Sequence, residues 1–474
     1  MKKKITVILL IVLIITITTA VLYQTFAMDT IIEESYEDSH LISLKSLDTK
    51  TVTVPAHDSK TIIYKIHNTN NGRVRYAVGY NTNSSVAVKI YNNSEDLEEG
   101  VINANEYRYV KLYLENSSSA NYNITISTIL GYEGGGDFIV PSGISLVSEV
   151  YIQPENMAKM ITDLYNSASK AEVINNNITY NYASSFNLMN DRLGGTTESL
   201  DSGNIRYYGA DPNNYLYFNC SDYNNQTSST CELWRIIGVF GNRVKIIRND
   251  SIGEYVYDDY SDSINDWSRS EAMKLLNDGY EDENFGGSLY YNAASGSCYV
   301  GRNAEVAACD FTSTGLKNDQ TRSLIDQVTW SLGGIDLTNI EIYSDQAYQY
   351  ERGDIVYPNS GNPTTWSGQI AFIYPSDYGY AADFSSCSQN LRNYSDSSCR
   401  YNNWLNNGAD QWLLTPNTTS SIFVNRVFYT GVVMSATSYD TYNIRPTLYL
   451  KSSSTVISGT GTSSDPYRLK GTNL

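Results

Sequence analysis

The sequence predicts a multi-domain chain with an N-terminal transmembrane helix, an all-β sandwich and an irregular α+β domain. An uncharged apolar stretch begins the chain, short segments of alternating polarity follow it, and the remaining strands and helices mix without regular alternation. The predicted boundaries are 1–28 for the anchor, 29–135 for the sandwich, 136–203 for a linker with a short amphipathic helix, and 204–474 for the last domain.

The N-terminal segment has the features of an export signal. Met1-Lys2-Lys3-Lys4 precedes an uncharged stretch that runs to Met28 and is rich in Ile, Leu, Val and Thr. A cleavable signal has an apolar core of roughly 7–15 residues, whereas a membrane-spanning helix needs about 20. The length favours a retained signal-anchor, with the lysines in the cytoplasm and everything from Asp29 outside. Thr25-Phe26-Ala27 leaves cleavage open as the alternative, and both outcomes export the rest.

Composition limits the classes of function. Hydrophobic residues make up 41% of the 474 residues, too many for a disordered stalk. A net charge of −18 repels phosphates, so we expect no nucleic-acid partner. The 41 tyrosines suit a sugar- or protein-binding surface, or reflect a compositional habit. The only histidines are His40, His57 and His67, which removes histidine-based catalysis and His-ligated zinc from the rest of the chain.

The segment from about Tyr36 to Leu130 has the two-residue periodicity of half-buried strands. The alternating stretches are 51–54, 61–66, 73–78, 86–90, 107–114 and 122–126. About six short strands separated by Asn, Gly and Ser turns predict an immunoglobulin-like sandwich. A module of this kind directly above a membrane is expected to be a spacer.

A glycine run, Gly134-Gly135-Gly136, marks the predicted start of the linker. Beyond it, Met157, Met160, Ile161 and Leu164 lie on one face of a predicted helix of three or four turns, with Pro154 near its start. We expect this face to pack against the next domain.

The last domain begins with the clearest local signal in the chain. Two apolar segments, 233–240 and 244–248, flank Gly241-Asn242-Arg243 and predict a hairpin. A helix is predicted from a Ser268 cap to Leu276, and another from Asn318 or Asp319 through Leu332. The later strands are predicted at 368–374, 411–414 and 444–450.

Several segments of this domain are similar to those of a known family. They are Glu232–Phe240, Tyr374–Tyr380, Asn403–Leu405, Gln411–Pro416, Ile444–Leu450 and Gly459–Tyr467, with Gly431 as a turn. Together they resemble bacterial surface proteins with a C-type-lectin-like domain, related in fold to the formylglycine-generating enzyme, over about residues 205–469. The resemblance implies a C-type-lectin-like fold but no particular ligand, because this fold hosts many functions.

The chain departs from the better-known relatives at their functional motifs. It lacks the Glu-Pro-Asn, Gln-Pro-Asp and Trp-Asn-Asp tripeptides with which the sugar-binding lectins hold calcium, and it has no cysteine after Cys399 for the oxidase chemistry. No catalytic residue, metal or cofactor is therefore carried over.

The six cysteines form close couples in the sequence, which an exported chain is expected to oxidise. These couples are Cys220/Cys231, Cys298/Cys309 and Cys387/Cys399. Local pairing is the simplest of 15 connectivities. We therefore interpret the cysteines as staples of long loops.

Candidate ligand-binding residues decorate the variable stretch between Thr415 and Tyr442. They are Phe423, Arg426, Tyr429, Tyr439 and Tyr442, with Trp404 as a further sugar platform. Core packing is the alternative for Trp404 and the preferred interpretation for Trp412. The acidic segment 277–284 is expected to be a solvated turn rather than a calcium loop, and Arg445 is expected to pair with a buried carboxylate.

These features predict a single-pass protein of the bacterial cell membrane with its C-terminal ectodomain outside. Its predicted partners are the membrane and a glycan or surface-protein ligand, and its predicted function is non-enzymatic binding. The alternatives are a carboxylate-based hydrolase or divergent oxidase on the same fold, and a purely structural envelope protein.

Overall fold

The computed structural model divides into two compact units, Met1–Gln153 and Pro154–Leu474. It describes residues 31–35, 47–68, 71–81, 85–91, 100–132, 138, 140–151, 155–192, 203–259, 264–336, 341–353, 356–357, 359 and 361–471. Within these residues no helix is long and apolar enough to cross a membrane. The anchor predicted at 1–28 lies outside them.

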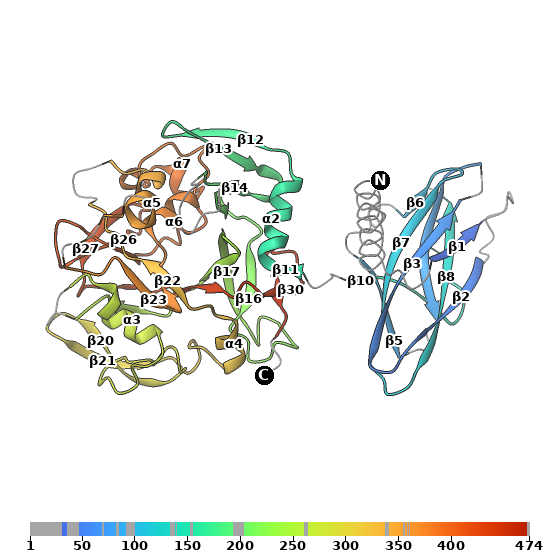
Figure 1. Ribbon diagram of the computed structural model, residues 1–474, viewed down its shortest axis with the longest axis horizontal. Helices are drawn as coiled ribbons and strands as arrows, with labels where there is room; N and C mark the ends of the chain where they lie inside the picture. Colours follow the sequence, from blue (N-terminus) through green and yellow to red (C-terminus); the bar gives the residue numbers. More distant parts are fainter. Residues whose placement is uncertain are drawn as a thin grey trace, which may run out of the picture. The chain divides into compact units, whose positions relative to one another are not determined.

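The described residues of the first unit form β-strands joined by turns and loops (Figure 1). They are β1 (Ile31–Ser35), β2 (Leu47–Val54), β3 (Asp58–His67), β4 (Val74–Asn81), β5 (Val86–Tyr91), β6 (Val101–Ile102), β7 (Tyr107–Asn116), β8 (Tyr122–Tyr132), β9 (Ile144–Leu146) and β10 (Glu149–Tyr151). One sheet has the order β1-β3-β7-β5-β10, and the other has β2-β8-β4-β6 with β9 beside β4. The six strands predicted from periodicity are confirmed as β2, β3, β4, β5, β7 and β8.

The two sheets of this unit share one hydrophobic core. Alternate residues along both sheets are buried, as Val110, Leu112 and Leu114 are in β7. The buried Thr128 hydroxyl of β8 donates to the Tyr64 hydroxyl of β3 at 2.7 Å, across the two sheets. The period-two pattern therefore corresponds to a sandwich of two sheets, each with one buried face.

The second unit is also rich in β-strands. They are β11 (Glu155–Asn156), β12 (Ala171–Asn175), β13 (Ile178–Ala183), β14 (Leu188–Asn190), β15 (Ile205–Tyr207), β16 (Tyr215–Phe218), β17 (Glu232–Phe240), β18 (Arg243–Arg248), β19 (Glu254–Val256), β20 (Ser295–Gly301), β21 (Glu305–Asp310), β22 (Val328–Ser331), β23 (Thr365–Gly368), β24 (Ile370–Ala371), β25 (Gln411–Pro416), β26 (Phe423–Val427), β27 (Val433–Thr437), β28 (Thr441–Asn443), β29 (Thr447–Leu450), β30 (Thr455–Ser458) and β31 (Arg468–Leu469).

Its helices are short. They are α2 (Met157–Ser167), α3 (Glu271–Leu276), α4 (Asp319–Leu324), α5 (Ser344–Arg352), α6 (Pro375–Tyr380) and α7 (Ser397–Arg400), with single 3₁₀ turns at Ser184–Phe186, Trp267–Arg269 and Leu391–Asn393.

The main sheet of this unit runs in the order β12-β13-β14-β15-β17-β18-β29-β24, with β16 paired to β17. A second sheet has the order β19-β28-β25-β26-β27, and β11, β30 and β31 form a third. The predicted hairpin is confirmed as β17 and β18. Its turn contains Gly241 at φ +62°, a backbone conformation that a side chain would strain. The pairs β20–β21 and β22–β23 stand outside these sheets.

The linker predicted at 136–203 is wrong for residues 155–192, which belong to the body of the second unit. The predicted helix is α2, capped by the Asn156 side chain, and it buries Met157, Ile161 and Tyr165. Beyond it, β12, β13 and β14 extend the main sheet. The Asn- and Ser-rich sequence suggests a flexible connector, but Asn176 and Asn177 adopt positive φ in the tight turn between β12 and β13.

The two other predicted helices are shorter than expected. Asn318 caps α4 as predicted, but the helix ends at Leu324, and Val328–Ser331 pairs with Thr365–Gly368 as strand β22. The apolar residues that fit one helical period therefore belong to two elements, a short helix and then a strand rich in β-branched and aromatic residues. Helix α3 is capped by Ser270 rather than by Ser268, which lies in the preceding 3₁₀ turn.

All six cysteines are paired. The disulfides are Cys220–Cys231, Cys298–Cys309 and Cys387–Cys399, the local pairs that the sequence predicts. They close loops with sequence separations of 11, 11 and 12 residues.

Candidate functional site

A charged cluster lies in the interior of the second unit, centred on Asp377 at the start of α6. The Asp377 carboxylate accepts hydrogen bonds from Arg206 Nη1 at 2.9 Å, Arg352 Nη2 at 2.5 Å and Lys245 Nζ at 2.6 Å. All four side chains are at most 1% exposed. Burial alone would raise the pKa of Asp377, but Arg352, Lys245 and Arg206 outweigh it and hold the pKa well below its usual range.

Two further carboxylic acids complete this group, which we call the Asp377 cluster: Asp191, Arg206, Lys245, Glu351, Arg352 and Asp377. Asp191 accepts from Arg206 Nε at 2.6 Å, and the amide and hydroxyl of Ser376 donate to Glu351 at 3.1 and 2.5 Å. Burial raises the pKa of Glu351 to about 8, although Arg352 and Ser376 act in the opposite direction. Burial therefore favours the protonated form of Glu351.

Aromatic rings enclose the cations of the cluster. The Phe240 ring centroid lies 4.6 Å from the guanidinium carbon of Arg206, 5.5 Å from that of Arg352 and 5.6 Å from Lys245 Nζ. Tyr449 lies 5.3 Å from the same ammonium group. These two rings therefore face the cations on one side.

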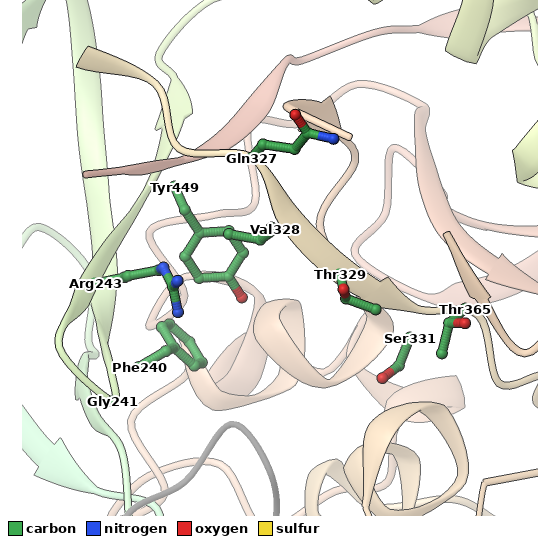
Figure 2. A pocket seen from close by; sticks show the side chains of 9 residues that line it. All are labelled: Phe240, Gly241, Arg243, Gln327, Val328, Thr329, Ser331, Thr365 and Tyr449. Atoms are coloured by element: carbon green, nitrogen blue, oxygen red, sulfur yellow. The ribbon is translucent and has the colours of Figure 1, made fainter. Parts of the chain in front are cut away.

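The same two rings line a cavity of about 550 Å³ (Figure 2). The cavity lies between the turn of the β17–β18 hairpin and the β22–β23 hairpin. Its lining residues are Phe240, Gly241, Arg243, Gln327, Val328, Thr329, Ser331, Thr365 and Tyr449. Small-molecule sites usually have volumes of roughly 300–1,000 Å³, so the cavity is large enough for a ligand of that class.

The cavity has an aromatic base and a polar rim. Phe240 and Tyr449 are buried, at 4% and 5% exposure, and their rings meet edge to face at 5.9 Å. Gln327, Thr329, Thr365 and Arg243 are exposed around them. Figure 2 shows Arg243 beside the two rings at one end, with Thr329, Ser331 and Thr365 at the other.

Hydrogen bonds fix the position of the polar rim. Arg243 donates from Nε to Asp326 Oδ2 at 2.5 Å, and the Asp326 amide donates to the Tyr449 carbonyl at 2.8 Å. The Tyr374 hydroxyl donates to the Ser331 carbonyl at 2.9 Å, which ties β22 to the start of α6. Both walls of the cavity are therefore connected to the strands and helix that hold the Asp377 cluster.

The structure brings some of the predicted site residues together away from the cavity, at the sheet β19-β28-β25-β26-β27. Arg426 Nη1 lies 3.0 Å from Asp410, and its guanidinium carbon lies 4.2 Å from the Tyr442 ring centroid. The Tyr429 amide donates to the same Asp410 carboxylate at 2.8 Å. Arg426 is only 8% exposed, so of these residues Tyr429, at 51%, offers the larger accessible surface.

The other predicted residues lie apart from this group. Trp404 is 6% exposed, donates its indole N–H to the Tyr207 carbonyl at 3.0 Å and packs against the Arg235 guanidinium, so it has the core-packing role given above as the alternative. Trp412 is buried and packs against Tyr442, in agreement with the predicted core role. Phe423, the first residue of β26, and Tyr439, in the turn after β27, are both half-buried.

Arg445 is buried as expected, but its partners differ from the prediction. It donates to the carbonyls of Arg248 at 3.0 Å and Leu405 at 3.3 Å, and to the Gln411 amide oxygen at 3.2 Å. Burial lowers the pKa of Arg445 to about 9, with Arg235 acting in the same direction. Backbone carbonyls therefore take the place of the expected carboxylate.

The cavity residues carry little signal in the sequence. Thr329 and Ser331 lie in a segment with a helical period, Thr365 in one without a clear pattern, and Arg243 in the turn of a hairpin. The β-branched and aromatic content of Val328-Thr329-Trp330 is the signal that could have revealed this strand.

The described residues contain no group of three or more His, Cys, Asp or Glu side chains placed to hold a metal ion. In the acidic segment 277–284, Glu281 accepts from the Asn292 side chain and Glu283 pairs with Lys274, interactions of a surface turn.

Comparison of the chain with protein-family models, with curated proteins and with solved structures found no match.

Proposed function

We propose that this chain is a membrane-anchored extracellular protein of a bacterium whose larger unit binds a saccharide in the cavity between the β17–β18 and β22–β23 hairpins. The observation that carries the proposal is the lining of this cavity. Sugars are recognised by aromatic surface together with hydroxyl, amide and guanidinium groups, and Tyr449, Phe240, Thr329, Thr365, Gln327 and Arg243 offer this combination.

The same lining favours binding over catalysis. Hydrolysis of a glycosidic bond uses a pair of carboxyl groups that face the substrate. The described residues that line the cavity include no Asp or Glu, and the carboxylate at its rim, Asp326, is paired with Arg243. The thiol that an oxidase would use is absent because every cysteine is in a disulfide. These observations support the non-enzymatic interpretation over the hydrolase and oxidase alternatives.

The proposal assigns a C-type-lectin-like fold to the larger unit and an immunoglobulin-like fold to the smaller one. The segments that carry the resemblance support the first assignment, because Glu232–Phe240 and Thr447–Leu450 are β17 and β29, the neighbours of β18 in the main sheet. The smaller unit would act as a spacer above the membrane. The disulfides support an oxidising compartment outside the cytoplasm.

The test is a glycan array probed with the full-length chain in a mild detergent, followed by calorimetry on the saccharides that bind. Thr365→Trp places a large ring in the cavity from an exposed strand position and is expected to weaken binding at least tenfold. Tyr429→Ala, in the turn between β26 and β27, is the control at the surface predicted from the sequence and should leave binding unchanged.

Two results would contradict the proposal. If Tyr429→Ala abolishes binding while Thr365→Trp has no effect, the ligand binds at the surface predicted from the sequence instead. If no saccharide binds above background, the protein is not a saccharide receptor.

A further inference from the structure

The guanidinium group of Arg243 has a free edge at the rim of the cavity. Its Nε donates to Asp326, whereas its two terminal nitrogens have no partner among the described residues. Figure 2 shows the group lying between the rings of Tyr449 and Phe240, at one end of the cavity. Paired N–H donors of this kind match the two oxygens of a carboxylate or phosphate.

The charge beneath the cavity also favours an anion. Arg243 and Lys245 are two residues apart in β18, so both side chains project from the same face of the strand, one at the rim and one in the interior. Lys245 lies 5.3 and 5.6 Å from the centroids of the rings that form the base of the cavity. The same two rings therefore line the cavity and contact Lys245 of the Asp377 cluster.

The cations of the cluster outnumber the carboxylates that pair directly with them. Arg206, Lys245 and Arg352 bring three positive charges, and Asp191 and Asp377 bring two negative ones. Burial raises the pKa of Glu351 to about 8, which disfavours its negative charge. At the rim, Arg243 pairs with Asp326. The cations of the cluster thus outnumber the carboxylates paired with them, which favours an anionic ligand in the cavity.

We propose that the cavity binds an acidic saccharide, in which a carboxylate or phosphodiester group receives the free edge of Arg243 while the sugar hydroxyls meet Thr329, Thr365 and Gln327. This inference rests on the proposed function and specifies its ligand class. Asp326 holds Arg243 in place but competes with the ligand for it. Removal of Arg243 and removal of Asp326 should therefore have opposite effects.

The experiment measures binding of matched probes to the full-length chain in detergent. The probes are galacturonate, glucuronate and mannuronate trisaccharides, the methyl ester of each, and a glycerol phosphate trimer. Wild type is expected to bind at least one acidic probe about tenfold more tightly than its neutral counterpart. Preference for a uronate assigns the carboxylate, and preference for the trimer assigns the phosphodiester.

The variants test the role of the rim. Arg243→Gln should lose about tenfold affinity for the acidic probe while its affinity for the ester stays unchanged. Asp326→Asn should gain several-fold for the acidic probe. Arg302→Gln is the matched control, because Arg302 is another exposed arginine paired with an aspartate, Asp440 at 3.3 Å, and it should change nothing.

The outcomes separate the two proposals. Equal binding of acid and ester by wild type overturns the inference but leaves saccharide binding intact, as does a loss of affinity in Asp326→Asn. Absence of binding by every probe, together with an empty glycan array, overturns both.

Discussion

Replacement of Glu351 by glutamine tests whether the buried acid is uncharged at neutral pH. Burial raises the pKa of Glu351 from 4.5 to about 8. The folded state therefore holds a proton that the unfolded state releases above pH 4.5. The stabilisation that this proton brings is complete below pH 4.5 and disappears as the pH rises through 8, so the wild-type protein loses stability over this window.

The size of the effect follows from the shift. Each pKa unit corresponds to about 1.36 kcal/mol, so a shift of this size amounts to about 5 kcal/mol between pH 4.5 and 8. Glu351→Gln keeps the shape, and its carbonyl oxygen can accept from the Ser376 amide, but it cannot ionise. It should match wild type near pH 5 and exceed it by several kcal/mol at pH 8, a difference on the order of 1–2 M in the urea midpoint for a slope of about 3 kcal/mol/M.

Tryptophan fluorescence is the suitable readout, because all six tryptophans lie in the second unit and the first contributes no signal. Urea titrations of the full-length chain at pH 5, 6, 7 and 8 give the two stability curves. If these curves run parallel across this range, Glu351 does not change its ionisation state and the reasoning is wrong.

The remaining predictions concern the same unit and the anchor. Asp377→Asn leaves three buried cations without their shared carboxylate and should cost about 3–5 kcal/mol of stability at neutral pH, measured by urea unfolding. Because the pKa of Asp377 is lowered, this cost should shrink as the pH falls below the usual value of 3.8. A cost that does not change with pH would contradict the ion pairing. Replacement of both Cys387 and Cys399 by alanine opens a loop with a sequence separation of 12 residues and should lower the stability by about 3 kcal/mol, which thermal unfolding would detect. In the presence of a reducing agent the variant and the wild type should be equally stable. Lys2, Lys3 and Lys4 with the apolar stretch behind them should keep the chain in the membrane pellet after alkaline carbonate extraction, whereas release into the supernatant would indicate cleavage.

The sequence predicts elements whose signals are local. The β17–β18 hairpin follows from two apolar runs around a Gly-Asn turn, and the strands of the first unit follow from strict alternation over a half-buried sheet. The close cysteine couples likewise pair with their neighbours. In each case the residues that determine the element lie close together in the sequence.

The cavity and the charged cluster depend on contacts that no local pattern contains. Arg206, Lys245, Arg352 and Asp377 come from separate strands and helices, and each resembles an ordinary surface charge in the sequence. The same limit explains Arg426, which was expected at the surface but is covered by the rings of Phe428 and Tyr442. Burial of a charge is decided by its partners, which the fold supplies.

The Asp191–Arg206 pair determines where this chain can be shortened. A fragment that begins at residue 204, the boundary suggested by the sequence, would keep Arg206, Lys245 and Arg352 but lose the carboxylate of Asp191. It would also remove α2 from the core and expose β15 as a bare sheet edge, a template for aggregation. A fragment that begins at residue 155 retains these parts, so expression of the two fragments side by side should give soluble protein only from the longer one.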